Sequence, residues 1–195
     1  MKTFYLATAM LISVIAATAQ TEKGTVNING LFGSNGGGIY QNNDAFNQFK
    51  LNLGIGTGYF VKNNWEIGAG VQFGVSRQKF KPPFDNLPGQ PAFEQSYKYN
   101  LGIYSKYYFG NKPVRPFAVI STGYNLTYDK QVNMGVESKG NSRYFNSGGG
   151  AGIIWFPSKK VGLFTQLTYD HIYSDMLDQG SFNLNFGVQI NLGKK

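Results

Sequence analysis

The sequence predicts an all-β protein, an eight-stranded antiparallel up-and-down transmembrane β-barrel. The first observation behind this prediction is an alternation of large apolar residues with polar residues or glycine, which recurs along most of the chain. Because side chains of a strand have a period of two, each alternating run has one apolar face and one polar face. The second observation is that short turns alternate with longer loops between the runs. This combination is typical of a barrel with an apolar outside and a narrow polar inside.

The amino-terminal segment, residues 1–19, has the pattern of a secretory signal peptide. Lys2 supplies the positive charge, residues 4–17 are mostly apolar, and Ala17-Thr18-Ala19 forms an Ala-x-Ala cleavage site. The alternative, an anchoring transmembrane helix, needs about 20 apolar residues, and this run is shorter. We therefore expect residues 20–195 to form one outer-membrane β-barrel domain.

Eight strand-like runs follow along this domain. Their expected bounds are Gly24–Gly33, Gln48–Val61, Trp65–Arg77, Tyr97–Phe109, Pro116–Lys130, Arg143–Phe156, Val161–Tyr173 and Ser181–Leu192. The alternation is cleanest in the second, third and eighth runs. In the eighth, the apolar face carries Phe182, Leu184, Phe186, Val188, Ile190 and Leu192.

The sixth run contains five consecutive small residues, 148–152, four of them glycine. Glycine is depleted in ordinary strands, but in a small barrel it eases strong bending and coiling. A phosphate-binding loop is the alternative, but neither GxGxxG nor GxxxxGK[ST] is present and no helix is predicted to follow. We therefore interpret this run as a strand.

The connections indicate which rim faces which side. Those at 62–64, 110–115 and 157–160 are short, whereas those at 34–47, 78–96, 131–142 and 174–180 are longer. Outer-membrane barrels have short periplasmic turns and longer extracellular loops. With an even number of strands, both termini are expected at the periplasmic rim.

Aromatic residues are expected to form two girdles around the apolar wall. Tyr59, Trp65, Tyr107, Phe109 and Trp155 lie near the short turns; Tyr97, Tyr99, Tyr124, Tyr128, Tyr169, Tyr173 and Phe182 lie near the longer loops. Amphipathic rings favour the headgroup level of a bilayer. Two bands separated by aliphatic residues are therefore typical of a membrane-spanning wall.

The end of the chain resembles a known signal. Asn185, Gly187, Ile190 and Leu192 match the polar-x-Gly-x-x-hydrophobic-x-hydrophobic pattern by which outer-membrane barrels are recognised for assembly, although this chain continues through residues 193–195 instead of ending on an aromatic residue. From about Gly24 onward it resembles the small outer-membrane β-barrel domain of Bacteroidetes, similar to the eight-stranded OmpA and OmpX barrels and often labelled porin-like. The resemblance implies a monomer in the lipid of a Gram-negative outer membrane, inserted by the barrel-assembly machinery. It implies no activity.

The composition argues against several other classes of protein. The formal net charge is +8, but the basic residues are dispersed and not clustered as in a nucleic-acid-binding domain. There is no cysteine and only one histidine, His171, so we expect no metal site, no cofactor and no catalytic residues. A lipid-modifying enzyme of the lipid A deacylase kind is an alternative, with Asp170, His171 and Ser174 close in sequence. In such enzymes serine lies two residues after histidine, where this chain has Tyr173, and Asp170 is expected on the opposite face from His171.

The inner face is expected to carry a polar network of Lys50, Glu66, Lys98, Lys106 and Asp170. Glu66 and Lys106 lie on neighbouring strands near the periplasmic rim and could pair, either as a gate or as a stabilising polar core. Because eight strands leave a lumen just wide enough for side chains, a wide channel is disfavoured. We predict a non-enzymatic barrel with a structural or adhesive, loop-presenting role; a narrow porin-like channel for small solutes and a lipid-modifying enzyme are the alternatives.

The connection at 78–96 is the candidate contact surface for an extracellular partner. It combines prolines with basic and aromatic residues, of which we single out Lys79, Lys81, Phe84 and Phe93. A merely variable loop is an equal alternative, because loops tolerate change as well as carry function.

Overall fold

The computed structural model describes residues 21–35, 40–42, 44–82, 92–133, 136–174 and 177–194. The expected signal peptide, residues 1–19, lies outside this part. Within the described ranges, no helix is long and apolar enough to cross a membrane.

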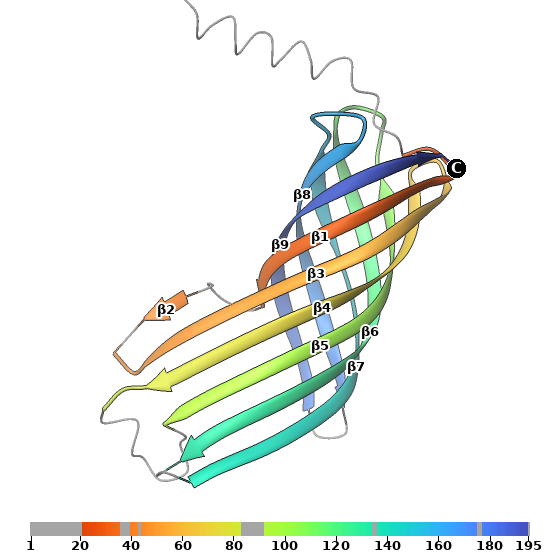
Figure 1. Ribbon diagram of the computed structural model, residues 1–195. Coiled ribbons are helices and arrows are strands. Elements are labelled where there is room, and N and C mark those ends of the chain that lie inside the picture. Colours follow the sequence, from red (N-terminus) through yellow and green to blue (C-terminus); the bar gives the residue numbers. More distant parts are fainter. Residues whose placement is uncertain are drawn as a thin grey trace, which may run out of the picture.

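The described chain forms one antiparallel sheet that closes on itself (Figure 1). Its strands are β1 (Thr25–Asn35), β2 (Tyr40–Asn42), β3 (Phe46–Lys62), β4 (Trp65–Phe80), β5 (Phe93–Tyr108), β6 (Val114–Asn133), β7 (Val136–Trp155), β8 (Val161–Ser174) and β9 (Leu177–Lys194). Consecutive strands pair from β3 to β9, β9 pairs with β1, and pairing of β1 with β3 closes the ring. The predicted eight-stranded up-and-down barrel is thus confirmed, with the short β2 added on the outer end of β3.

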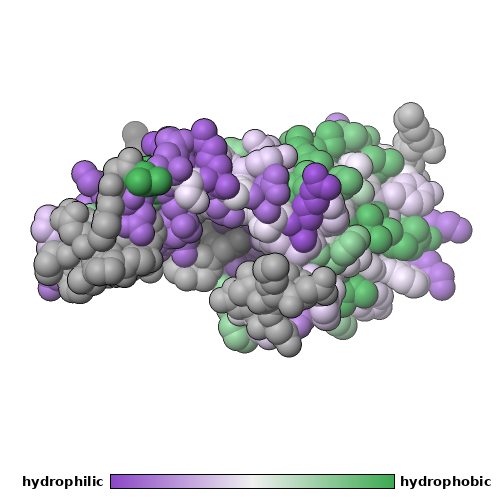
Figure 2. All heavy atoms as spheres, turned by 90° about the horizontal axis from the view of Figure 1, so that it is seen from below, coloured by the Kyte–Doolittle hydropathy of each residue, from purple (hydrophilic) through white to green (hydrophobic). Residues whose placement is uncertain are grey.

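The alternation sorts side chains as the sequence predicts. On β9, the side chains of Phe182, Leu184, Phe186, Val188, Ile190 and Leu192 are all exposed on the outer wall, whereas Asn183, Asn185, Gln189 and Asn191 are buried in the lumen. In Figure 2, hydrophilic residues gather over the left end, where the outer ends of β3 to β7 lie in Figure 1, and hydrophobic residues gather farther right. The barrel is therefore apolar outside and largely polar inside, the inverse of a soluble protein.

The periplasmic rim is built from short turns. The turn between β3 and β4 contains Asn64 with a φ of 64°, a left-handed conformation that asparagine adopts more readily than most residues. The turn between β5 and β6 contains Gly110 with a φ of 78°. Thr25 is paired with Lys194, so the start of β1 and the end of β9 meet at this same rim.

The opposite rim differs from the prediction in one respect. The segment 131–142, expected to be a long loop, is mostly strand: β6 continues to Asn133 and β7 begins at Val136. Likewise β9 begins at Leu177, inside the loop expected at 174–180. Residues 136–143 are exposed whichever face they lie on. The period-two signal depends on one buried or lipid-facing side, so it disappears where both faces meet water although the backbone pairing continues.

This rim is also uneven. β7 pairs with β8 only from Phe145 onward, whereas its pairing with β6 extends to Val136. β3 to β7 therefore continue as a sheet beyond the ends of β8, β9 and β1, as Figure 1 shows at the lower left.

Candidate functional site: a plugged lumen and a projecting sheet

The periplasmic half of the lumen is filled by apolar and aromatic side chains. This plug consists of Phe60, Tyr108, Phe117, Val119, Ile154, Phe156 and Phe164. Its rings pack in a chain, with centroids 5.6 Å apart for Phe60 and Tyr108, and 5.6 Å for Tyr108 and Phe117. The plug blocks the periplasmic end of the lumen with residues from five different strands or their ends.

Glu66 is fully buried beside the plug and is held by neutral donors. Its Oε1 accepts hydrogen bonds from the Tyr104 hydroxyl at 2.7 Å and from Asn29 Nδ2 at 3.2 Å. Its Oε2 accepts from the Tyr108 hydroxyl at 2.5 Å, and that hydroxyl also lies 2.9 Å from Gln189 Oε1. Hydrogen bonds to a charged acceptor are stronger than neutral ones, so this cluster joins β1, β4, β5 and β9 across the lumen.

Two glycines make room for this cluster. A Cβ on Gly58 would lie within 3.0 Å of the Glu66 carboxylate, and a Cβ on Gly68 would lie within 3.0 Å of the Tyr104 ring. Glycine at these inward positions therefore leaves room for side chains of the adjacent strand, Glu66 over Gly58 and Tyr104 over Gly68.

Lys106 is the direct register partner of Glu66 and is 5% exposed, but no ion pair joins them. No carboxylate of the described residues lies within 4.0 Å of its ammonium, and its nitrogen donates to no described acceptor. Instead Nζ lies over three aromatic rings, at 4.7 Å from the centroid of Phe164, 4.9 Å from that of Tyr104 and 5.5 Å from that of Phe117. The expected ion pair between Glu66 and Lys106 is therefore not formed, because the hydroxyls of Tyr104 and Tyr108 bind the carboxylate.

A third charged residue seals the periplasmic rim. Arg115 is 2% exposed and donates to Thr21, to Asn64 Oδ1 at 3.2 Å and to the carbonyl oxygen of Lys112 at 2.7 Å. Its guanidinium also lies 5.5 Å from the centroid of the Phe156 ring. The sequence analysis did not identify Arg115. Its position could have indicated a buried role, because it follows a short turn and faces the lumen.

Outward from Lys106 the lumen contains a cavity of about 150 Å³ lined by both polar and apolar side chains. Asn100, Asn125 and Asn146 bond to one another across β5, β6 and β7 at 2.7 to 3.2 Å. On the other side, Asp170 accepts from Asn183 Nδ2 at 2.6 Å and from Thr168 Oγ1 at 3.3 Å. The asparagine cluster was not predicted, because only the register shows that these three positions meet.

The structure thus divides the five predicted lumen residues. Glu66 lies beside the plug, hydrogen-bonded to Tyr108, and Lys106 lies between the plug and the cavity. Lys98 and Asp170 line the cavity, and Lys98 Nζ lies 5.5 Å from the centroid of the Tyr144 ring. Lys50 is farther out on β3 and does not line the cavity.

The residues proposed as an assembly signal all lie on β9. Asn185 is buried in the lumen, and Gly187 lies against the Phe164 ring, where a Cβ would clash. Ile190 and Leu192 point out of the barrel. Their role in assembly stays a prediction.

Of the residues considered for lipid chemistry, Asp170 and His171 do not pair with each other. Asp170 is bound inside the lumen, whereas the His171 ring packs against Tyr173 with centroids 4.7 Å apart. The side chain of Ser174 is outside the described part. No group of three or more His, Asp or Glu among the described residues could hold a metal ion.

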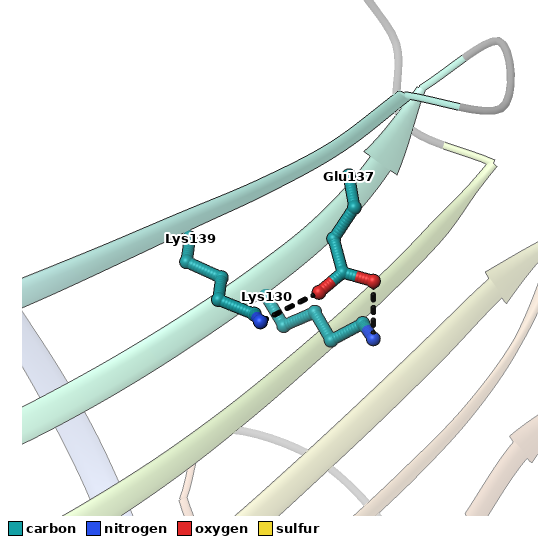
Figure 3. Close-up of polar contacts among 3 residues, drawn as sticks. All are labelled: Lys130, Glu137 and Lys139. Carbon is teal, nitrogen blue, oxygen red and sulfur yellow. Dashed lines mark ion pairs between the residues drawn. The ribbon is translucent and has the colours of Figure 1, made fainter.

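The second candidate site is the β6–β7 hairpin, which we call the projecting hairpin and define as residues 129–133 and 136–144. Its outer face carries Lys130, Glu137 and Lys139, joined by ion pairs of 2.6 Å and 2.9 Å to the two oxygens of Glu137 (Figure 3). The two hydrogen bonds from these lysines lower the pKa of the Glu137 carboxyl below its ordinary value. Farther along the same face the residues become apolar, at Phe145 and Tyr128, which indicates where the membrane begins.

The predicted contact loop is only partly described. Lys79 on β4 pairs with Phe93 on β5, and the backbone of Lys81 bonds to Ala45. Phe84 lies outside the described residues.

Comparison with known proteins gives a family and a shared fold. Residues 4–190 match the family described as outer membrane protein beta-barrel domain. The OprG structure from Pseudomonas aeruginosa is 12% identical, with a TM-score of 0.64 over 90% of this chain and 99% of that chain. A major outer membrane protein from Thermus thermophilus is 12% identical, with a TM-score of 0.57 over 86% and 99%. Neisserial surface protein A is 16% identical, with a TM-score of 0.52 over 86% and 97%. A comparison with curated proteins finds no match.

Proposed function

We propose that this chain, which belongs to the outer membrane protein beta-barrel domain family, is a non-enzymatic, non-conducting barrel that presents an adhesive sheet outside the cell. It is an integral protein of the Gram-negative outer membrane. The observation that carries this proposal is the unpaired edge of β7. From Val136 to Tyr144, β7 has β6 on one side and no described strand on the other.

Such an edge can bind a partner through its backbone. Unpaired backbone N–H and C=O groups form a template onto which an extended segment of another protein adds as a further strand. The side chains along this edge include Lys139 and Arg143, and Lys130 lies beside them on β6. In the ion-paired group of the projecting hairpin, two lysines surround a single acid, Glu137. The outer face of the hairpin is therefore positively charged and favours an acidic partner.

A conducting channel, the first alternative, is disfavoured by the plug. Seven buried apolar or aromatic side chains, closed at the rim by Arg115, occupy the periplasmic half of the lumen. In a ring of eight strands little cross-section remains beyond that filled by side chains.

A lipid-modifying enzyme, the second alternative, is disfavoured by the separation of Asp170 from His171. Asp170 is bound to Asn183 inside the lumen, whereas the His171 ring packs against Tyr173, so Asp170 does not orient the His171 imidazole as a triad carboxylate would.

The test is to remove the projecting hairpin without changing the barrel. Asp129 and Gly140 are register partners, so replacing residues 130–139 with Asn-Gly closes the shortened hairpin with a two-residue turn. The matched control replaces residues 85–91 with a Gly/Ser segment of equal length and leaves the projecting hairpin intact. Both variants should keep the gel shift between unheated and heated samples that marks a folded barrel.

Cells producing each variant are then tested for attachment to a panel of immobilised extracellular matrix proteins. The proposal expects attachment by the wild type and the control, and loss with the shortened hairpin. Loss only in the control would move the contact surface to the loop that contains Phe84. Equal attachment by all three would overturn an adhesive role for both segments.

A further inference from the structure

We propose that the lumen cavity is a binding site for a small organic carboxylate, held by Lys106 and reached from the extracellular side. This inference does not depend on the adhesive role of the projecting hairpin. It rests on a buried cation, Lys106, for which the described residues supply no hydrogen-bond acceptor.

The ammonium of Lys106 has three N–H donors, and within the described chain none of them has an acceptor. Three aromatic faces at 4.7 to 5.5 Å attract its charge but accept no strong hydrogen bond. A charged group this deeply buried is costly unless it is both paired and hydrogen-bonded. Lys106 lines the cavity, so its ammonium can be hydrogen-bonded there by water or, as we propose, by a ligand that displaces the water.

Glu66 does not fulfil this role, although it stands opposite Lys106. Its two oxygens already accept hydrogen bonds from Tyr104, Tyr108 and Asn29 on the plug side. Its negative charge is on the strand beside Lys106 and repels a monoanion less than a dianion such as phosphate. The electrostatics therefore favour a monoanion.

The remaining wall of the cavity suits a carboxylate with a short body. Lys98 also lines the cavity, and the one acid there, Asp170, is bound by Asn183 and Thr168. Near Lys106 the lining includes the apolar side chains of Leu31, Val119 and Phe164. A cavity of about 150 Å³ is large enough for a ligand the size of benzene.

The periplasmic plug sets the direction of entry. Tyr108 and Phe117 lie on the far side of Lys106 from the cavity, and Arg115 closes the rim behind them. A ligand would therefore enter past the asparagine cluster of Asn100, Asn125 and Asn146.

Calorimetric titration of the purified protein in a non-ionic detergent tests the proposal. The probes are sodium benzoate, sodium acetate and benzamide, which has the shape of benzoate without its charge. The variants are Lys106→Met, which keeps the length of the side chain and removes its charge, and Lys130→Met as the matched control on the projecting hairpin. Gel shift and thermal unfolding confirm that each variant is folded.

We expect saturable binding of benzoate or acetate by the wild type and by Lys130→Met, at least tenfold weaker binding by Lys106→Met, and no binding of benzamide. Absence of saturable carboxylate binding by the wild type, or equal binding by Lys106→Met, would overturn the proposal. If Lys106→Met does not fold, bromide-soaked crystals of the wild type decide: an anomalous peak beside Lys106 Nζ supports an anion site, and a cavity without one overturns it.

Discussion

Glu66 and Lys106 are register partners on β4 and β5, yet tyrosine hydroxyls bind the carboxylate and aromatic rings surround the ammonium. Two opposite charges thus lie side by side in a narrow lumen without an ion pair. Each is stabilised by different neighbours, so each should respond differently to substitution.

Replacing Glu66 with Gln should destabilise the barrel by about 1–3 kcal/mol, because it removes a charged acceptor shared by Tyr104, Tyr108 and Asn29. Equilibrium unfolding in urea, followed by tryptophan fluorescence in lipid vesicles, measures this change. Glu137→Gln, at an exposed ion pair, is the control and should leave the unfolding midpoint almost unchanged. Exchanging the charges, with Glu66→Lys and Lys106→Glu together, should not restore stability; recovery would show that the two groups do interact directly.

Replacing Gly68 with Ala should destabilise the barrel by about 1–3 kcal/mol through overpacking. The new Cβ would lie within 3.0 Å of the Tyr104 ring and of the Thr57 carbonyl oxygen. Gly30→Ala is the matched control, because nothing lies within 4 Å of its Cβ. Equal unfolding midpoints for the two variants would mean that Tyr104 does not cross the lumen beside Gly68.

The projecting hairpin should be slightly less protected in acid. The pKa of Glu137 is lowered when folded by hydrogen bonds from Lys130 and Lys139, so its stabilising effect is present above the unfolded value, about pH 4.3, and is lost as the pH falls through the lower folded value. Amide hydrogen exchange of residues 130–139, corrected for its intrinsic pH dependence, should therefore show weaker protection at pH 3 than at pH 6. Glu137→Gln should remove this difference, and a difference that persists in this variant would have another origin.

The wild-type protein should show no steady single-channel conductance in planar bilayers, because the plug fills the periplasmic half of the lumen. Phe117 and Phe164, whose ring centroids are 6.2 Å apart, form the part of the plug that faces Lys106. Replacing both with Ala should enlarge the lumen but still give no steady conductance, because Phe60, Tyr108, Phe156 and Arg115 remain. Each change should cost about 3–5 kcal/mol of stability, so the gel shift must be checked first. Steady channels in the wild type would contradict a closed plug.

The sequence by itself determined the barrel. The period-two pattern on runs such as 181–192 fixed which side chains face lipid and which face the lumen, since a residue cannot change face without shifting the whole strand. The pattern did not show how far β6 and β7 continue into water, because beyond Tyr128 and Phe145 neither face is buried and the period carries no information.

The contents of the lumen were decided by the tertiary structure. The sequence placed Glu66 and Lys106 on the inner face, but the partners of each depend on side chains that cross from β1, β8 and β9: Asn29 and Gln189 within the carboxylate cluster, and Phe164 against the ammonium. These side-chain contacts follow from the tilt and register of the strands around a closed ring. They bring together residues more than eighty positions apart, such as Tyr108 and Gln189. Only closure of the ring therefore shows that the protein satisfies the carboxylate of Glu66 and leaves the ammonium of Lys106 facing a cavity.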